Sequence, residues 1–235
     1  MISSSRIALA LSALVLALTS SAGAVTGSVP DRETHPYVGA LVVDGSVRCS
    51  GVLVDRSTFV TAAHCVSGLP AGAAIAATFD AAIDKTSWTL HVGVPHVHPG
   101  YKSNGNDIAA VVLAEPVDVA PAALPRAAGA DGLAGADVTS VGYGYHGVAA
   151  DGSWLYDGLR RAADSPVVKV SKSSLRLDAS VAGPCLGDSG GPQLVGDTVV
   201  SITTSGSKTC DKKVDSLRLD TFSVRTFLAG FVTLP

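Results

Sequence analysis

Charged residues are scarce in this chain of 235 residues, since Asp, Glu, Lys and Arg make up only 16% of it. No block of Lys or Arg occurs, and the formal net charge is −3. The composition therefore gives no indication of a nucleic-acid-binding surface or of attraction to an anionic membrane. Hydrophobic residues amount to 47%, which is enough to bury a sizeable core and argues against wholesale disorder.

Apolar runs long enough to span a membrane are also missing. The run Ile7–Leu18 would be about 18 Å long as a helix, whereas a bilayer core is roughly 30 Å thick. Arg6 precedes this run, and the small residues Ala22 and Ala24 follow it, which is typical of a secretory signal peptide. We expect a signal peptide over residues 1–24, a secreted, extracellular mature chain that starts at Val25, and no membrane association after cleavage.

Potential metal ligands are few and scattered. The four cysteines contain no Cys-x-x-Cys pair, so a zinc site is disfavoured, and in an exported protein they indicate two disulfides with three possible pairings. His91, His96 and His98 have no carboxylate or cysteine nearby in sequence, and a surface strand explains them more simply. We expect no metal and no cofactor.

Short apolar runs rich in Val, Thr and Ile recur between turn residues. They are Tyr37–Val43, Gly51–Val54, Thr58–Ala62, Ile108–Leu113, Val138–Val141, Pro166–Val170 and Val199–Thr203. This pattern predicts an all-β sandwich or barrel. A helical period is clear only at the end, where apolar residues at positions 224, 227, 228, 231 and 232 predict an amphipathic helix. The stretch 115–136, rich in Ala, Pro and Gly, is predicted to connect two halves.

Three segments carry residues suited to nucleophilic catalysis. Ser189 lies in Gly187–Pro192, where glycines allow a tight turn and leave backbone N–H groups free to bind a developing oxyanion. His64, in Thr61–Cys65, can accept a proton near neutral pH and return it. Asp107 opens an apolar strand and can hold one imidazole tautomer. Each alone could be structural: a turn serine, a core histidine or an Asx turn.

Taken together and in this order, the three segments resemble the trypsin/chymotrypsin serine proteases. The resemblance implies two six-stranded antiparallel Greek-key β-barrels, at 25–120 and 121–235, the second with a C-terminal helix. It implies that His64 is the general base and acid, Asp107 orients it, Ser189 is the nucleophile, and the N–H groups of Gly187 and Ser189 form the oxyanion hole. It also implies the disulfides Cys49–Cys65 and Cys185–Cys210.

The resemblance further implies a primary specificity pocket walled by Gly183, Leu186, Ser201, Ile202 and Thr203. Trypsins carry an aspartate six residues before the nucleophile, where this chain has Gly183, so cleavage after Arg or Lys is not expected. Thr203 occupies a place where a glycine commonly leaves the pocket open. Both features favour a small or medium apolar residue before the cut, unless a downstream carboxylate, Asp211 or Asp215, points inward.

Activation and partners follow from the same resemblance. A freed α-amino group is expected to pair with Asp188, and Val25 is the residue that signal cleavage would expose. The expected partners are protein or peptide substrates and protein protease inhibitors, and the chain is expected to be a monomer that binds no nucleic acid. A catalytically silent pseudoprotease that serves as a binding module is the alternative, and an esterase is a third option.

Overall fold

The computed structural model describes residues 27–102 and 105–235. The predicted signal peptide and Val25 lie outside the described residues. No helix in the described ranges is long and apolar enough to cross a membrane.

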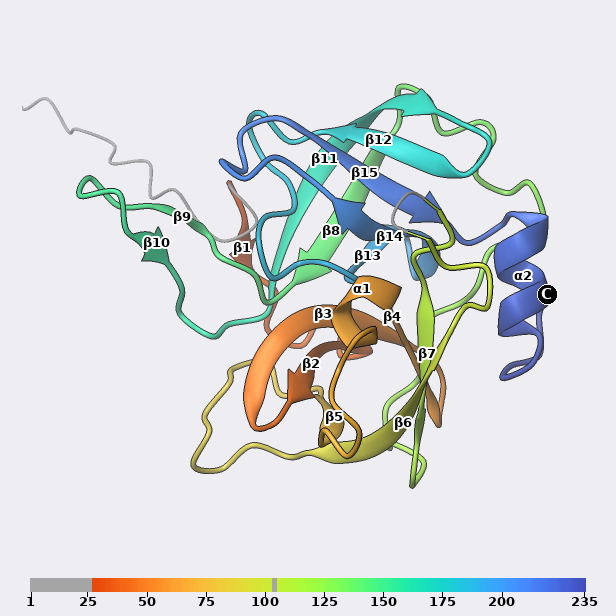
Figure 1. The fold of residues 1–235 in the computed structure, drawn as a ribbon. Helices are drawn as coiled ribbons and strands as arrows, with labels where there is room; N and C mark the ends of the chain where they lie inside the picture. Colours follow the sequence, from red (N-terminus) through yellow and green to blue (C-terminus); the bar gives the residue numbers. More distant parts are fainter. Residues whose placement is uncertain (1–26, 103–104) are drawn as a thin grey trace, which may run out of the picture.

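The first half of the chain forms a closed antiparallel barrel (Figure 1). Its strands, which pair in the order β2-β3-β4-β7-β6-β5, are β2 (Val38–Val43), β3 (Ser46–Asp55), β4 (Thr58–Thr61), β5 (Ile75–Thr78), β6 (His91–Val97) and β7 (Ala109–Leu113). All residues of β2 and β4 are buried, because these strands face both the barrel interior and the rest of the protein. The one-turn helix α1 (Ala63–Val66) follows β4 directly.

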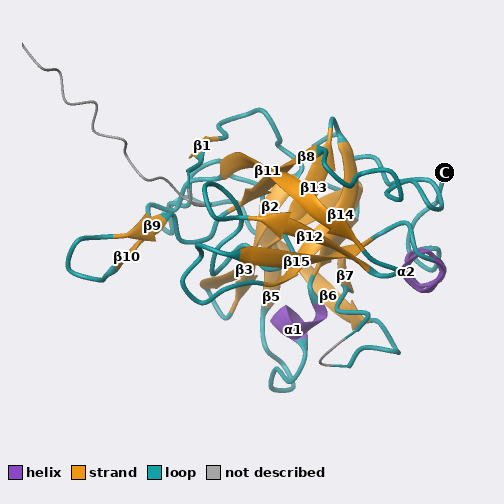
Figure 2. Ribbon diagram, turned by 90° about the horizontal axis from the view of Figure 1, so that it is seen from above, coloured by secondary structure: helices purple, strands orange, loops and turns teal. Residues whose placement is uncertain are grey.

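The second half forms another barrel. Its strands, in pairing order, are β11 (Arg161–Val170), β12 (Ser174–Asp178), β15 (Lys213–Arg218), β14 (Thr198–Ser205), β13 (Pro192–Val195) and β8 (Asp137–Gly142), and β8 pairs with β11 to close it. The short strand β1 (Val29–Pro30) adds to β11. A small hairpin of β9 (Gly147–Val148) and β10 (Trp154–Leu155) projects from the body of the molecule (Figures 1 and 2).

The two barrels pack on one another through a shared apolar core. One continuous cluster contains Leu53 and Phe59 of the first barrel together with Leu194 and Ile202 of the second. Residues 114–136, all of which the structure describes, add no strand to either barrel.

The predicted fold class, two six-stranded antiparallel barrels with a C-terminal helix, is confirmed. The helix α2 (Phe222–Leu228) is shorter than its apolar period predicts. It buries Val224 and Leu228, and the chain turns at Gly230 before Phe231 and Val232.

Candidate active site

The imidazole of His64 and the carboxylate of Asp107 form a hydrogen-bonded pair at the junction of the barrels. His64 Nδ1 lies 2.7 Å from Asp107 Oδ2, and the backbone N–H of His64 donates to Asp107 Oδ1 at 2.8 Å. Because an ionised carboxylate can only accept, the proton of this pair belongs on Nδ1, which leaves Nε2 as an acceptor. The His64 side chain is 35% exposed and that of Asp107 15%, so the pair is sheltered yet reachable.

Local backbone geometry holds both residues in place. His64 lies on α1, and the next residue, Cys65, is bonded to Cys49 of β3. Asp107 follows Asn106, which has a left-handed φ of 51°, a conformation that asparagine tolerates. The Asn106 amide is fixed on both sides, because it donates to the carbonyl of Gly100 and accepts from the hydroxyl of Ser223 on α2.

The loop that carries Ser189 is bonded directly to the first barrel through Ser50 of β3. The N–H of Ser50 donates to the carbonyl of Ser189 at 2.9 Å, and its hydroxyl donates to the carbonyl of Gly187 at 3.0 Å. The Sγ atom of Cys65 lies 3.9 Å from the same Ser189 carbonyl. This loop, named here the nucleophile loop after the role predicted for Ser189, therefore contacts the residue next to His64, although Ser189 Oγ makes no hydrogen bond within the described ranges. Ser50 is fully buried and lies in no motif, so the sequence gives no sign of its contact with this loop.

The backbone of the nucleophile loop leaves two amide groups available. Gly187 has a φ of 94°, and a Cβ there would lie 2.9 Å from the Cα of Gly144, so the position requires glycine. Neither Gly187 N–H nor Ser189 N–H donates to another group in the described part of the chain. Free N–H groups beside a serine are the arrangement that binds a tetrahedral oxyanion.

Asp188 is buried inside this loop. Its carboxylate accepts from the N–H of Gly144 and from the N–H of Cys185, each at 2.8 Å. Burial raises the pKa of Asp188 to about 7, although the two backbone hydrogen bonds act in the opposite direction. Gly27, the first described residue, packs against the carbonyl of Val181 in the segment leading to this loop.

Both disulfides have the predicted pairing, Cys49–Cys65 and Cys185–Cys210. The first fixes the segment that carries His64. The second joins the nucleophile loop to the loop after β14.

A cavity of about 70 Å³ opens beside Ser189. Of the predicted pocket residues, Leu186 and Thr203 line it, together with Pro184, Cys185, Gly187, Ser189, Ser205, Gly206, Ser207 and Val214. A buried cavity of roughly 150 Å³ holds a benzene ring, so this one suits only a small side chain. A Cβ on Gly206 would lie 3.3 Å from a methyl group of Val214, so these two residues face each other and limit the space.

The other predicted pocket residues lie away from this cavity. Ser201 and Ile202 are fully buried in β14, where the Ser201 hydroxyl donates to Gln193 and Ile202 joins the apolar core. Gly183 packs against Ala179, and a side chain there would collide with it. The cavity wall on β14 therefore begins at Thr203, where the sequence prediction ended, and runs on to Ser207.

The two downstream carboxylates do not line the cavity. Asp215 makes a two-pronged ion pair with Arg176 at 2.8 and 2.9 Å. Asp211 accepts hydrogen bonds from the hydroxyls of Ser207 and Thr209. Neither restores a negative charge beside Ser189.

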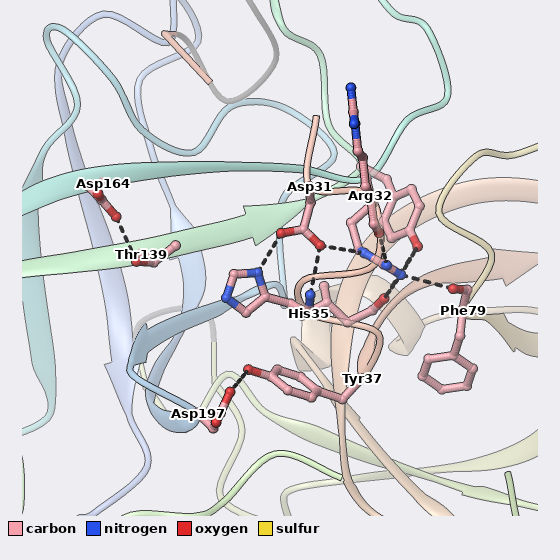
Figure 3. Close-up of polar contacts among 11 residues, drawn as sticks. Asp31, Arg32, His35, Tyr37, Phe79, Thr139, Asp164 and Asp197 are labelled. Atoms are coloured by element: carbon pink, nitrogen blue, oxygen red, sulfur yellow. Dashed lines mark hydrogen bonds and ion pairs between the residues drawn. The ribbon is translucent and has the colours of Figure 1, made fainter. Parts of the chain in front are cut away.

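A buried polar network joins the N-terminal segment to both barrels (Figure 3). The fully buried Arg160 pairs with Asp31 at 2.9 Å and also donates to the carbonyls of Arg32 and Phe79. Asp31 additionally accepts from the ring of His35 at 2.5 Å.

This network reaches the nucleophile loop through Tyr143. Arg160 donates to the Tyr143 hydroxyl at 3.3 Å, while the N–H of Tyr143 donates to Ser50 Oγ and the next residue, Gly144, binds Asp188. The sequence analysis missed Arg160, because nothing in its neighbourhood distinguishes it from a surface arginine.

The three clustered histidines have separate surroundings. The ring of His91 lies against Phe79, that of His96 against Phe231, and that of His98 against Phe227, with a hydrogen bond from Gly100 N–H to His98 Nδ1. Within the described ranges, the one group of side chains close enough to share a metal ion is Cys49, His64 and Cys65. Its two sulfurs are already joined in a disulfide.

Comparison with known proteins agrees with this geometry. The family model described as Trypsin matches residues 24–217. The chain is 28% identical over 203 residues to a protein named Trypsin from Saccharopolyspora erythraea, covering 77% of this chain and 86% of the relative. It is 29% identical over 226 residues to Granzyme M from Homo sapiens, covering 88% of each. It is 29% identical over 190 residues to Brachyurin from Leptuca pugilator, covering 73% of this chain and 81% of the relative.

Proposed function

The chain belongs to the trypsin family of serine proteases, and we propose that it is an active, secreted endopeptidase that works through His64, Asp107 and Ser189. The observation that carries this proposal is the sheltered His64–Asp107 pair, 2.7 Å apart, beside a serine loop with two free amide groups. A binding module has no need of this arrangement, so we favour the enzyme over a pseudoprotease.

The proposed reaction has two stages. Ser189 Oγ attacks the substrate carbonyl while His64 Nε2 takes its proton, and Asp107 stabilises the imidazolium that forms. His64 then gives the proton to the leaving amine, and water hydrolyses the acyl-enzyme by the same route. The N–H groups of Gly187 and Ser189 bind the oxyanion, and in such sites each donor contributes about 3–4 kcal/mol of transition-state stabilisation.

We propose that the residue before the cut is small and uncharged. The cavity of about 70 Å³ beside Ser189 is too small for an aromatic ring, and no carboxylate lines it to attract Arg or Lys. This is narrower than the small or medium apolar residue that the sequence predicts.

We also propose that export completes the site. Signal cleavage after Ala24 would give Val25 a free amino group, which would pair with Asp188. The burial of Asp188 supports this, because a buried carboxylate with a raised pKa gains most from a cationic partner. Sequencing the N-terminus of active, secreted protein tests this step, and a start other than Val25 would overturn it.

The enzyme itself is tested with a fluorophosphonate that labels activated serines. We expect the purified mature protein to be labelled at Ser189 and to cleave peptides after alanine, while Ser189→Ala abolishes both. Ser180→Ala, which changes an exposed serine, is the matched control and should be labelled normally. An unlabelled, folded protein would support the pseudoprotease, and labelling with ester but no peptide hydrolysis would support an esterase.

A further inference from the structure

A second cavity, of about 360 Å³, lies on the other side of the nucleophile loop. Leu186 and Gly187 line both this cavity and the small one beside Ser189. A polypeptide whose carbonyl oxygen is held by Gly187 N–H must extend in both directions from that point. The small cavity takes the side chain on one side of the scissile bond, and the larger one is available to the other side.

We assign the larger cavity to the side of the leaving amine. One of its walls is the start of β3, including Val47 and Arg48. The next residue, Cys49, is bonded to Cys65, which adjoins His64. Because His64 must protonate the leaving amine, the residues that follow the cut have to pass on this side.

Two exposed cations that form no ion pair within the described ranges, Arg48 and Lys85, line the larger cavity. The ammonium of Lys85 lies 6.0 Å from the ring centre of Trp88, which is not among the residues that line the cavity. The adjacent carboxylate, Asp84, accepts hydrogen bonds from Thr86 and Ser87 instead of pairing with Lys85. No carboxylate is among the residues that line the cavity.

The remaining wall is aromatic and fixed to the nucleophile loop. Tyr145 and Tyr156 line the cavity with their ring centres 5.7 Å apart, and Trp154 of β10 packs on Tyr145 at 5.6 Å. The N–H of Tyr145 donates to the carbonyl of Leu186 at 2.8 Å. The base of the projecting hairpin (Figure 1) is thereby held beside Gly187, so the wall is preformed.

We propose that this cavity is a binding subsite that selects an acidic side chain, Asp or Glu, on the leaving side of the scissile bond. The inference rests on the proposed endopeptidase function and specifies its substrate. Arg48 and Lys85 supply the charge complementarity, and the tyrosine pair packs against the stem of the bound residue. The enzyme then prefers substrates with a small uncharged residue before the cut and an acidic residue shortly after it.

The test uses matched peptides with alanine before the cut and with Glu, Gln or Lys in turn at the first and second positions after it. At low salt, we expect the wild-type kcat/KM to be about fivefold higher for the Glu peptide than for the Gln peptide at one of these positions, because one or two exposed charge pairs contribute an effect of that size. The Lys peptide should have a lower kcat/KM than the Gln peptide. Raising the salt to about 1 M should shrink the ratio, because exposed charges are screened.

Variants identify the residues responsible. We expect the ratio of Glu to Gln to fall toward one in Arg48→Ala combined with Lys85→Ala, and to keep its wild-type value in Lys169→Ala, which removes an exposed lysine of β11. Using the ratio within each variant cancels any general loss of activity. A ratio near one in the wild type, or a ratio that the double variant leaves unchanged, would overturn the subsite.

Failure of the proposed function would look different. In that case the wild type would cleave none of the peptides and would not be labelled at Ser189. Binding of the same Glu and Gln peptides, measured by fluorescence anisotropy, would then still decide the subsite. Tighter binding of Glu that depends on Arg48 and Lys85 supports it, and equal binding overturns it.

Discussion

At the scale of single residues, Val214 has the clearest control over the space beside Ser189. It lies on β15, is 2% exposed, and faces Gly206 across the small cavity. A glycine on one wall leaves the entrance open, and the valine on the other closes the interior. In the proposed specificity, this pair limits the volume available to the substrate side chain, and the lining without a carboxylate disfavours a cationic one.

Replacing Val214 with alanine should widen the preference. We expect Val214→Ala to raise kcat/KM for cleavage after leucine, relative to alanine, by about tenfold, since one or two carbon atoms in an apolar pocket change discrimination by that order. Assays on a pair of peptides that differ only at this residue measure the ratio. Val195→Ala, on exposed β13 surface, is the control. An unchanged ratio would mean that the small cavity does not receive the side chain.

The residues proposed for the catalytic centre could be identified from sequence because each lies in a short, distinctive segment. His64 and Asp107 are joined as predicted, and the pairing of the four cysteines is confirmed. The pocket could not be predicted as well. Its wall depends on where the strand register places Thr203 of β14 and on the path of the chain beyond the end of β14 at Gly206, which a local motif does not encode. Ser50 and Arg160 act through contacts far away in sequence, so they carry no local signal.

At the scale of elements, the polar network around Arg160 fixes the N-terminal segment, which strand pairing alone holds weakly. The two-residue strand β1 alone would fix little of the N-terminal segment. Asp31 and the carbonyl of Arg32 bind the guanidinium, and Tyr37 adds a hydrogen bond from its hydroxyl to Asp197 at 2.8 Å (Figure 3). The segment is therefore held mainly by polar contacts buried between the barrels.

Removing the guanidinium of Arg160 should lower the stability of the folded protein. We expect Arg160→Met to lower the free energy of unfolding by about 3–5 kcal/mol, because it removes the guanidinium from the buried carboxylate of Asp31, which keeps only His35, and takes a donor from the carbonyls of Arg32 and Phe79. Arg176→Met removes the exposed pair with Asp215 and should change it by less than about 1 kcal/mol. Urea denaturation with the disulfides intact measures both. Equal effects of the two substitutions would contradict a special role for Arg160.

The elements themselves were predicted unevenly. Each of the seven apolar runs falls within or beside an observed strand, because continuous runs of Val, Ile and Thr favour the strand conformation. The surface strand expected around the three histidines is β6. Strands β12 and β15 were missed, since Arg, Asp and Lys interrupt them where alternate side chains face solvent, and the short strands β5 and β13 were missed as well. The C-terminal helix was predicted, but its end depends on the turn at Gly230 rather than on apolar spacing.

At the scale of the whole molecule, pH should distinguish a chain that starts at Val25 from one with extra residues before it. Without a cationic partner, Asp188 has a pKa of about 7 in the folded state against 3.8 as the ordinary value. The folded state then holds a proton that the unfolded chain releases between about pH 4 and 7. Stability therefore falls as the pH rises through that window.

We expect a chain extended by two alanines before Val25 to lose on the order of a few kcal/mol of unfolding free energy between pH 4 and 7.5 relative to the Val25 chain. In the Val25 chain the amino group stabilises the carboxylate, so the loss should be absent. Asp188→Asn in the extended chain should remove the dependence, which assigns it to this carboxyl. Denaturation curves at several pH values measure it, and parallel curves for the two starts would refute the pairing.

The proposed base, His64, and the proposed nucleophile, Ser189, belong to different barrels, and each disulfide closes a loop within one barrel only. A chain in which just one barrel has closed holds either a histidine with no serine to activate or a serine with no base. The proposed hydrolytic activity therefore requires both barrels to be closed and docked. A copy in which only one barrel has folded would carry half of the proposed site and no activity.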